Sequence, residues 1–269
     1  MNERVLSGYI SVRTAIEAKS REVYKIILDE ERYENIQKSS FHATEKRQYE
    51  ALKKSGIPIE FVSRDAFLAI CGNTSAGGIA CYAGERIYSD LNEVLDQQNA
   101  YIVVLDGIED PYNFGFALRT LYAAGVDGVI LPQRNFLSSD EIVVRSSAGA
   151  SELLKIAATD DLAGACRLAK EKGFMLVSTD KNDKARNLYK VRLKRPICLV
   201  FGGEKRGISA SIIDMSDLVV KLKYPRECHF ALSASSAVSI ISFEVAKKLE
   251  SGSPNHPRNL AHNNRFRNT

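Results

Sequence analysis

The pattern of hydrophobic and polar positions changes near residue 100. From Tyr101 onward, short, nearly continuous runs of Val, Ile and Leu alternate with segments of helical periodicity. Such runs are typical of buried parallel strands joined by helices. The pattern predicts strands over 102–105, 128–131, 175–178, 197–201 and 218–222, and helices over 116–124, 140–147, 162–172, 209–215 and 235–250. An α/β domain with a parallel sheet over residues 100–250 follows.

The first 85 residues predict a second, smaller α/β domain. Helical segments over 12–18, 42–55 and 64–71 alternate with strand-like runs over 23–28, 59–62 and 79–83. Residues 86–99 are expected to form a linker that contains a short helix. Residues 251–269 hold three arginines, no acid and no apolar periodicity, so we expect a disordered basic tail.

Composition narrows the class of protein only slightly. The 269 residues carry a formal net charge of +4, which is compatible with a polyanionic partner without requiring one. The five cysteines are scattered, which argues against a disulfide framework or a zinc site. The N-terminal residues lack the apolar core of a signal peptide, and no run approaches the ~20 apolar residues of a membrane span. We expect a cytoplasmic protein that needs neither membrane nor metal.

The segment after the predicted strand 102–105 carries the strongest candidate chemistry. A polar turn with Asp110 and Asn113 follows this strand, and Arg119 lies on the next helix. Polar groups at the end of such a strand occupy the edge where open α/β sheets bind ligands. Taken alone, Asn113 is more simply explained as a residue that forms the turn, and Arg119 as a residue on the surface of a helix. Their joint placement favours a site.

Two further segments have unusual composition. After the strand 197–201 come Gly202, Gly203 and Gly207, and glycines there let a ligand approach the backbone closely. Before the last helix stands a run of small residues, Ala231 to Ala237. The simpler interpretations are a glycine-rich turn without ligand and a closely packed helix start.

Together the three segments resemble the SpoU (TrmH-type) family of RNA ribose methyltransferases, in the SPOUT superfamily. Asn113, Gly115 and Arg119 match the spacing of its first motif, and Phe-Gly-x-Glu from Phe201 begins its second. Leu232 and Ser235 match the third motif. Lys205, Ala231 and Ser233 depart from the family, which usually has Gly, Ser and Asn at these positions. The resemblance is specific from residue 101 to 248 and weak before residue 90.

The resemblance implies methyl transfer from S-adenosylmethionine to a ribose 2′-oxygen of rRNA or tRNA, without metal. It also implies a homodimer, an RNA-recognition role for residues 1–85, and a deep trefoil knot in the C-terminal methyltransferase domain. The implied catalytic residues are Arg119, Asn113, Glu204, Ser233 and Ser235. The implied cofactor residues are Thr179, Gly202, Gly203, Gly207, Leu222 and Leu232.

The role of Arg119 follows from its chemistry as well. A guanidinium stays protonated at neutral pH and is therefore a poor base. We therefore favour Arg119 as a clamp on the adjacent phosphate and a stabiliser of the developing alkoxide, oriented by Glu204. A role as general base would need an unusual environment.

Three alternatives remain open. Ala231 and Ser233 favour a catalytically impaired, RNA-binding relative of the same fold. An ordinary doubly wound nucleotide-binding enzyme is opposed by the lack of Gly-x-Gly-x-x-Gly after the strand 102–105. The basic tail is either solvated or an arm that contacts RNA.

Overall fold

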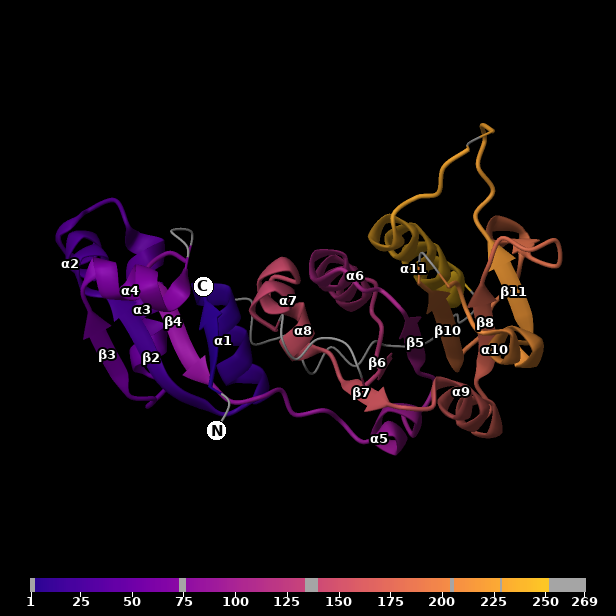
Figure 1. Cartoon of the computed structure of the whole chain (residues 1–269), viewed down its shortest axis with the longest axis horizontal. Coiled ribbons are helices and arrows are strands. Elements are labelled where there is room, and N and C mark those ends of the chain that lie inside the picture. Colours follow the sequence, from indigo (N-terminus) through magenta and orange to yellow (C-terminus); the bar gives the residue numbers. More distant parts are fainter. Residues whose placement is uncertain (1–2, 73–75, 134–139, 204–205, 228, 252–269) are drawn as a thin grey trace. The chain divides into compact units, whose positions relative to one another are not determined.

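The computed structural model describes residues 3–72, 76–133, 140–203, 206–227 and 229–251. The chain divides after Glu85 into two compact units, which are described separately (Figure 1). Apart from Ser251, the predicted tail lies outside the described residues, and so do Glu204, Lys205 and Cys228. Within the part of the chain that is described, no helix is both long and apolar enough to cross a membrane.

The N-terminal unit contains a mixed four-stranded sheet with the order β1-β4-β2-β3. Strands β2 and β3 are parallel, whereas β4 is antiparallel to both β1 and β2. The strands are β1 (Arg4–Ser7), β2 (Val23–Asp29), β3 (Ile59–Val62) and β4 (Ile79–Ala83). The helices are α1 (Tyr9–Ala18), α2 (Glu30–Lys38), α3 (Ala43–Lys53) and α4 (Arg64–Cys71).

Helix α2 was not predicted because its sequence is polar on nearly every side. Its only buried residue is Ile36, so it lacks an apolar stripe. Local interactions define it instead. The Asp29 side chain accepts a hydrogen bond from the backbone N–H of Arg32, and Glu30 and Glu31 occupy the positive end of the helix dipole.

The C-terminal unit contains a seven-stranded, all-parallel sheet with the order β7-β6-β5-β10-β8-β11-β9, which confirms the predicted parallel sheet. The strands are β5 (Tyr101–Asp106), β6 (Gly128–Pro132), β7 (Ile156–Thr159), β8 (Met175–Thr179), β9 (Arg186–Asn187), β10 (Ile197–Gly202) and β11 (Leu218–Lys221). The helices are α5 (Leu91–Leu95), α6 (Pro111–Ala123), α7 (Asp140–Ser146), α8 (Ala150–Leu153), α9 (Leu162–Glu171), α10 (Ala210–Met215) and α11 (Ala234–Ser251), with a 3₁₀ helix η1 (Leu188–Lys190).

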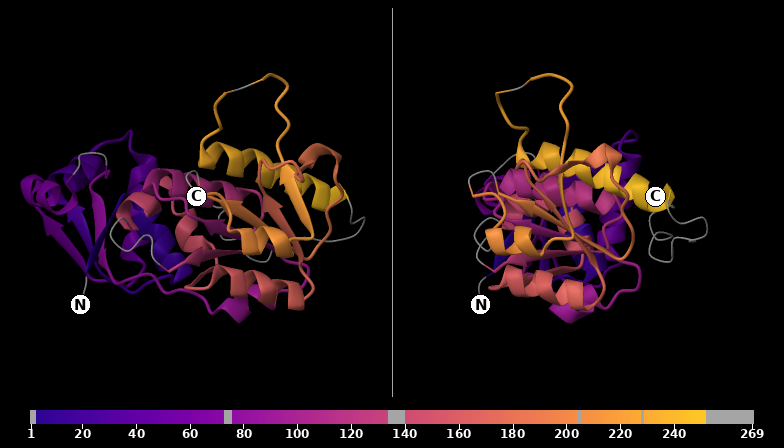
Figure 2. Two further views of the ribbon diagram at one scale, coloured as in Figure 1. Left: turned by 45° about the vertical axis from the view of Figure 1, so that its right-hand side comes forward. Right: turned by 90° about the vertical axis from the view of Figure 1, so that its right-hand side faces the viewer.

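Helices cover both faces of this sheet (Figure 2). Along β5, Tyr101, Val103 and Leu105 pack in one core with residues of α6 and α11. Ile102 and Val104 point to the other face, where they pack with α5, α9 and α10. Burial of both faces explains why the strands read as continuous apolar runs rather than as an alternating pattern.

Helix α6 begins five residues before the predicted start at residue 116, so the placement of Asn113 in a turn was wrong. Asp110 is the N-cap: its side chain accepts a hydrogen bond from the Asn113 backbone N–H at 2.7 Å. Pro111 follows in the first turn, where its missing N–H costs nothing. Asn113 and Arg119 therefore lie on the same helix.

Candidate functional site

The strands that precede the candidate residues end at one edge of the C-terminal sheet. Asp106 at the end of β5 is in register with Gly202 at the end of β10. Thr179 at the end of β8 is in register with Val220 of β11. Because these strands are parallel, the segments after them emerge at the same edge, where α/β sheets bind ligands.

The first and third sequence motifs meet beside this edge. The Ser235 hydroxyl, in the first turn of α11, donates to the side-chain oxygen of Asn113 at 3.0 Å. Asn113 is itself held in the first turn of α6 by Asp110. The two candidate residues are thus in direct contact although 122 positions separate them.

Hydroxyl groups continue this seam between α6 and α11. The side chains of Thr120 and Ser239 hydrogen-bond across it at 3.0 Å, and Ser239 also donates to the carbonyl of Ser235 at 2.8 Å. These directional contacts fix how α11 is rotated and shifted against α6. They therefore support the meeting of Asn113 and Ser235.

Ser233 has a different role from Ser235. Its Oγ accepts a hydrogen bond from the backbone N–H of Ser236 at 3.3 Å, so it caps the N-terminus of α11. Its side chain also lies 2.9 Å from Ser236 Oγ and 3.2 Å from Ser235 Oγ. Ala231 is exposed. The structure therefore links Ser233 to the site through Ser235 and the start of the helix.

The glycine-rich loop after β10 packs backbone against backbone. Gly203 and Gly207 form an isolated bridge, with the Gly207 N–H 3.0 Å from the Gly203 carbonyl oxygen. A methyl group on Gly203 would lie 2.3 Å from the carbonyl oxygen of Gly107, in the loop after β5. One on Gly202 would lie 2.3 Å from the carbonyl carbon of Gly207. Only glycine permits this approach, which leaves main-chain groups rather than side chains at the strand ends.

The remaining cofactor candidates border the same edge. The Thr179 hydroxyl donates to the Val200 carbonyl oxygen at 3.0 Å, so it ties β8 to β10. Leu222, directly after β11, is half-buried against the core shared with α6 and α11. Leu232, also half-buried, lies in the connection from β11 to α11, which projects from the sheet (Figures 1 and 2).

Arg119 is separated from this cluster. Six residues beyond Asn113 on α6, it lies about 9 Å further along the helix axis, and its side chain is exposed. Among the described residues, no carboxylate forms an ion pair with its guanidinium. Glu204, the expected partner, lies outside the described residues.

Arg119 shares its surface with an apolar patch that the sequence analysis missed. Exposed on α6 are Tyr112 (56%) and Phe116 (47%), and on the adjacent α11 Ile240 (41%) and Phe243 (51%). Tyr112 and Phe116 are four residues apart and Ile240 and Phe243 three, so each pair lies on one face of its helix. This spacing is the feature of the sequence from which the patch could have been predicted. We call these four residues the α6/α11 patch. Exposed apolar clusters of this kind mark interaction surfaces.

Comparison with known proteins matches both the sequence and the fold. The model of the SpoU rRNA Methylase family matches residues 100–243. A Staphylococcus aureus protein assigned to the TrmH family of tRNA/rRNA methyltransferases is 30% identical over 254 residues, which cover 92% of this chain and 97% of that protein. A Staphylococcus saprophyticus protein of the same description is 31% identical over 177 residues, 64% of this chain and 70% of that one.

Two solved structures share the fold at low sequence identity. The SpoU methyltransferase AviRb from Streptomyces viridochromogenes, in complex with AdoMet, has a TM-score of 0.74 at 20% identity and covers 93% of this chain and 92% of its own. An AdoMet-bound rRNA methyltransferase from Sinorhizobium meliloti also has a TM-score of 0.74, at 18% identity, with 92% and 88% covered. With the family model spanning more than half of the chain and the S. aureus protein nearly all of it, this chain belongs to the SpoU rRNA methylase family.

Proposed function

We propose that the protein transfers a methyl group from S-adenosylmethionine to a ribose 2′-oxygen of tRNA or rRNA. Family membership and the AdoMet complexes of two structural neighbours support this assignment. The observation that carries it is the contact between Ser235 and Asn113, which joins two family motifs beside the glycine-rich strand ends.

The strand edge fits the cofactor. The glycines at 202 and 203 keep side chains away from the strand ends, so a polar ligand can approach the main chain there. Leu222 and Leu232 would supply apolar contacts to a base. The Thr179 hydroxyl is already bonded to the Val200 carbonyl oxygen, so Thr179 would shape the cofactor site by holding β8 against β10. When bound, S-adenosylmethionine supplies an electrophilic methyl group on a sulfonium.

Arg119 would act on the RNA. Its guanidinium stays charged at neutral pH, so it holds the phosphate beside the target ribose and stabilises the negative charge that develops on the 2′-oxygen. Glu204 would orient it. Asn113, anchored through its side-chain oxygen, keeps both amide hydrogens for the acceptor nucleotide, and Ser235 and Ser233 hold it in place.

We also propose that the protein works as a homodimer through the α6/α11 patch. Four large apolar side chains, each 41–56% exposed, lie on two adjacent helices. Covering them would also cover Arg119, which lies on the same face of α6. Arg119 would then be partly desolvated and could act beside the strand edge of the partner copy, although it lies apart from Asn113 within its own chain.

The domain roles complete the proposal. Residues 1–85 would recognise the RNA, and residues 100–250 would carry the transfer. The segment from β11 into α11 would be threaded through an earlier loop to form the trefoil knot. Val238, Ile241 and Val245 support it, because they place one face of α11 in the core that also holds β5 and β10, so the last helix packs on the sheet.

The decisive experiment combines calorimetry with methyl transfer. We expect the purified protein to bind S-adenosylmethionine and to label rRNA or tRNA at a ribose 2′-oxygen, while Arg119→Ala binds the cofactor but does not label RNA. Absence of cofactor binding by the folded native protein would refute the proposal. Cofactor-independent RNA binding would then support the catalytically impaired relative that Ala231 and Ser233 suggest.

A further inference from the structure

Residues 181–195 form a strongly basic segment, which we call the basic strap. It contains seven Lys or Arg residues and one Asp, a net charge of +6. The whole chain carries +4, so everything outside the strap carries a net −2. The net positive charge of this protein therefore lies in the strap and in the basic tail 251–269, which carries +3, and the rest of the chain is net negative.

The strap alternates between residues that anchor it and residues that face solvent. Its aliphatic side chains are at most 8% exposed: Ala185, Leu188, Val191 and Leu193. The last three of these belong to the core that holds α6 and α11. Its basic side chains between these anchors are exposed: Lys184, Arg186, Lys190, Arg192 and Lys194. The fold therefore presents a row of cations on a fixed backbone.

The strap starts at the candidate site. It follows Thr179 at the carboxyl edge of the sheet, and Lys221 of β11 donates to the Asn182 carbonyl oxygen at 3.3 Å. In β9, Arg186 is in register with Val220 at the edge of the sheet. Further along, Lys248 of α11 donates to the Tyr189 carbonyl oxygen at 3.2 Å. The row of cations thus leads away from the site along the flank of the unit.

The charge on the strap is largely unneutralised. Within the described ranges, Lys184, Arg186, Lys190 and Arg192 form no ion pair with any acid, whereas Arg195 pairs with Asp127 at 3.3 Å. Tyr189 lies among them with 48% of its surface exposed. Exposed cations in a row with an interleaved aromatic ring are the features with which proteins bind phosphates and bases of single strands.

We propose that the basic strap is a docking surface for the RNA backbone next to the nucleotide bound at the candidate site. This inference rests on the proposed RNA substrate. Lys184, Arg186, Lys190 and Arg192 contact successive phosphates, and Tyr189 stacks on a base. A membrane surface is disfavoured, because the apolar side chains of the strap are buried in the core and cannot enter a bilayer.

The test is the salt dependence of RNA binding by the full-length protein. A fluorescein-labelled single-stranded RNA of about 24 nucleotides is titrated by anisotropy between about 50 and about 200 mM NaCl. For Arg186→Glu/Arg192→Glu we expect binding at the lower salt to weaken by at least about tenfold, and the salt slope to fall by about two. Lys155→Glu/Arg167→Glu, which makes the same charge change at exposed sites elsewhere on the unit, should weaken binding less than about threefold.

The controls separate this inference from the proposed function. Calorimetry with S-adenosylmethionine should give the same affinity for native protein, strap variant and control variant, since none of these residues belongs to the cofactor edge. Equal loss of RNA binding in both double variants would overturn the strap and leave only a general effect of charge. Unchanged RNA binding by the strap variant would overturn it as well, whereas failure of the native protein to bind cofactor would count against the proposed function alone.

Discussion

The Ser235 hydroxyl donates a hydrogen bond to the side-chain oxygen of Asn113, with 3.0 Å between the two oxygens. The bond joins the first turn of α11 to the first turn of α6, so each residue fixes the orientation of the other. We expect Asn113→Ala and Ser235→Ala each to reduce methyl transfer. Because they remove the same contact, the double variant should lose less than the product of the two single losses, with a coupling of about 0.5–3 kcal/mol.

A double-mutant cycle on initial rates of methyl transfer measures this coupling. Ser239→Ala removes the contact with Thr120 and the bond to the Ser235 carbonyl but keeps both side chains of the Asn113–Ser235 bond, so it measures how much of the effect comes from the rest of the contact between α6 and α11. Strictly multiplicative losses for Asn113→Ala and Ser235→Ala would show that the two residues act independently.

Arg119 should affect transfer rather than cofactor binding. Loss of a cation that stabilises developing charge costs about 10²–10³ in rate, so Arg119→Ala should lower kcat by about that factor. Arg119→Lys should recover little, because an ammonium lacks the forked geometry of a guanidinium. Single-turnover rates, together with calorimetric affinity for S-adenosylmethionine, measure both effects. A lost cofactor affinity with unchanged kcat would place Arg119 in the cofactor pocket instead.

The α6/α11 patch should control the oligomeric state. Phe243 is 51% exposed in the single chain, and Phe243→Glu would place a charge in the proposed dimer interface. We expect a dimeric native protein and a largely monomeric variant in sedimentation equilibrium, with methyl transfer lost together with the dimer. Ile87→Glu, at a position 65% exposed outside the patch, should leave the dimer intact. A monomeric native protein would exclude the proposed interface.

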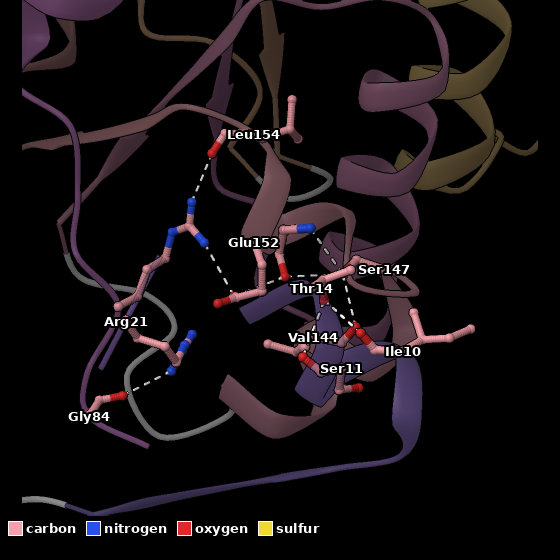
Figure 3. A network of polar contacts seen from close by, with 11 residues as sticks. Ile10, Ser11, Thr14, Arg21, Gly84, Val144, Ser147, Glu152 and Leu154 are labelled. Atoms are coloured by element: carbon pink, nitrogen blue, oxygen red, sulfur yellow. Dashed lines mark hydrogen bonds and ion pairs between the residues drawn. The ribbon is translucent and has the colours of Figure 1, made fainter. Parts of the chain in front are cut away.

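A buried ion pair in the C-terminal unit should make its stability sensitive to the loss of one partner. Arg86 donates to Glu152 at 3.2 Å and to the Leu154 carbonyl oxygen at 2.8 Å, and the two charged side chains are 8% and 0% exposed. Figure 3 labels the two acceptor residues, Glu152 and Leu154. Arg86→Met leaves the Glu152 carboxylate buried without the Arg86 guanidinium, so it should lower the free energy of unfolding by about 3–5 kcal/mol. Urea denaturation measures the change.

The surface pair of Arg145 and Glu141 provides the matched control. It joins neighbouring turns of α7, and its two side chains are 43% and 33% exposed. Arg145→Met should therefore cost no more than about 1 kcal/mol. Similar losses for Arg86→Met and Arg145→Met would mean that burial adds nothing to the stabilisation by Arg86.

Asp217 should make stability fall in acid. Burial raises the pKa of this carboxyl, but hydrogen bonds from Lys170 Nζ at 2.7 Å and the Leu176 N–H at 2.8 Å outweigh it, so the pKa lies below its ordinary value. A lowered pKa stabilises the fold above the unfolded value of about 3.9, and this contribution is lost as the pH falls through the folded pKa.

The variant Asp217→Asn tests this linkage. It should be less stable than the native protein at neutral pH, and the difference should shrink as the pH falls below about 4. Asp160→Asn, which removes the same charge at an exposed position, is measured alongside at each pH. A constant difference between Asp217→Asn and the native protein at all pH values would contradict the assignment.

Burial of both sheet faces explains how much of the fold could be predicted from sequence. The strands β5, β8 and β10 were found because each contains a continuous run of apolar residues, and β3, α4 and β4 were found with their observed bounds. Strand β9 has only two residues and exists through its pairing with β11, so it carries no local signal. The family motifs identified Asn113 and Ser235, but no spacing in one sequence reveals that they touch across 122 positions.

The division of labour within the basic strap has an evolutionary consequence. The residues that hold it in the fold, such as Leu188 and Val191, are different from those that set its charge, such as Arg186 and Arg192. Substitutions at the exposed positions can therefore change the surface potential while the core stays as it is. Single substitutions at these exposed positions in descendants of this chain could therefore change which nucleic acids are bound while the chain still folds.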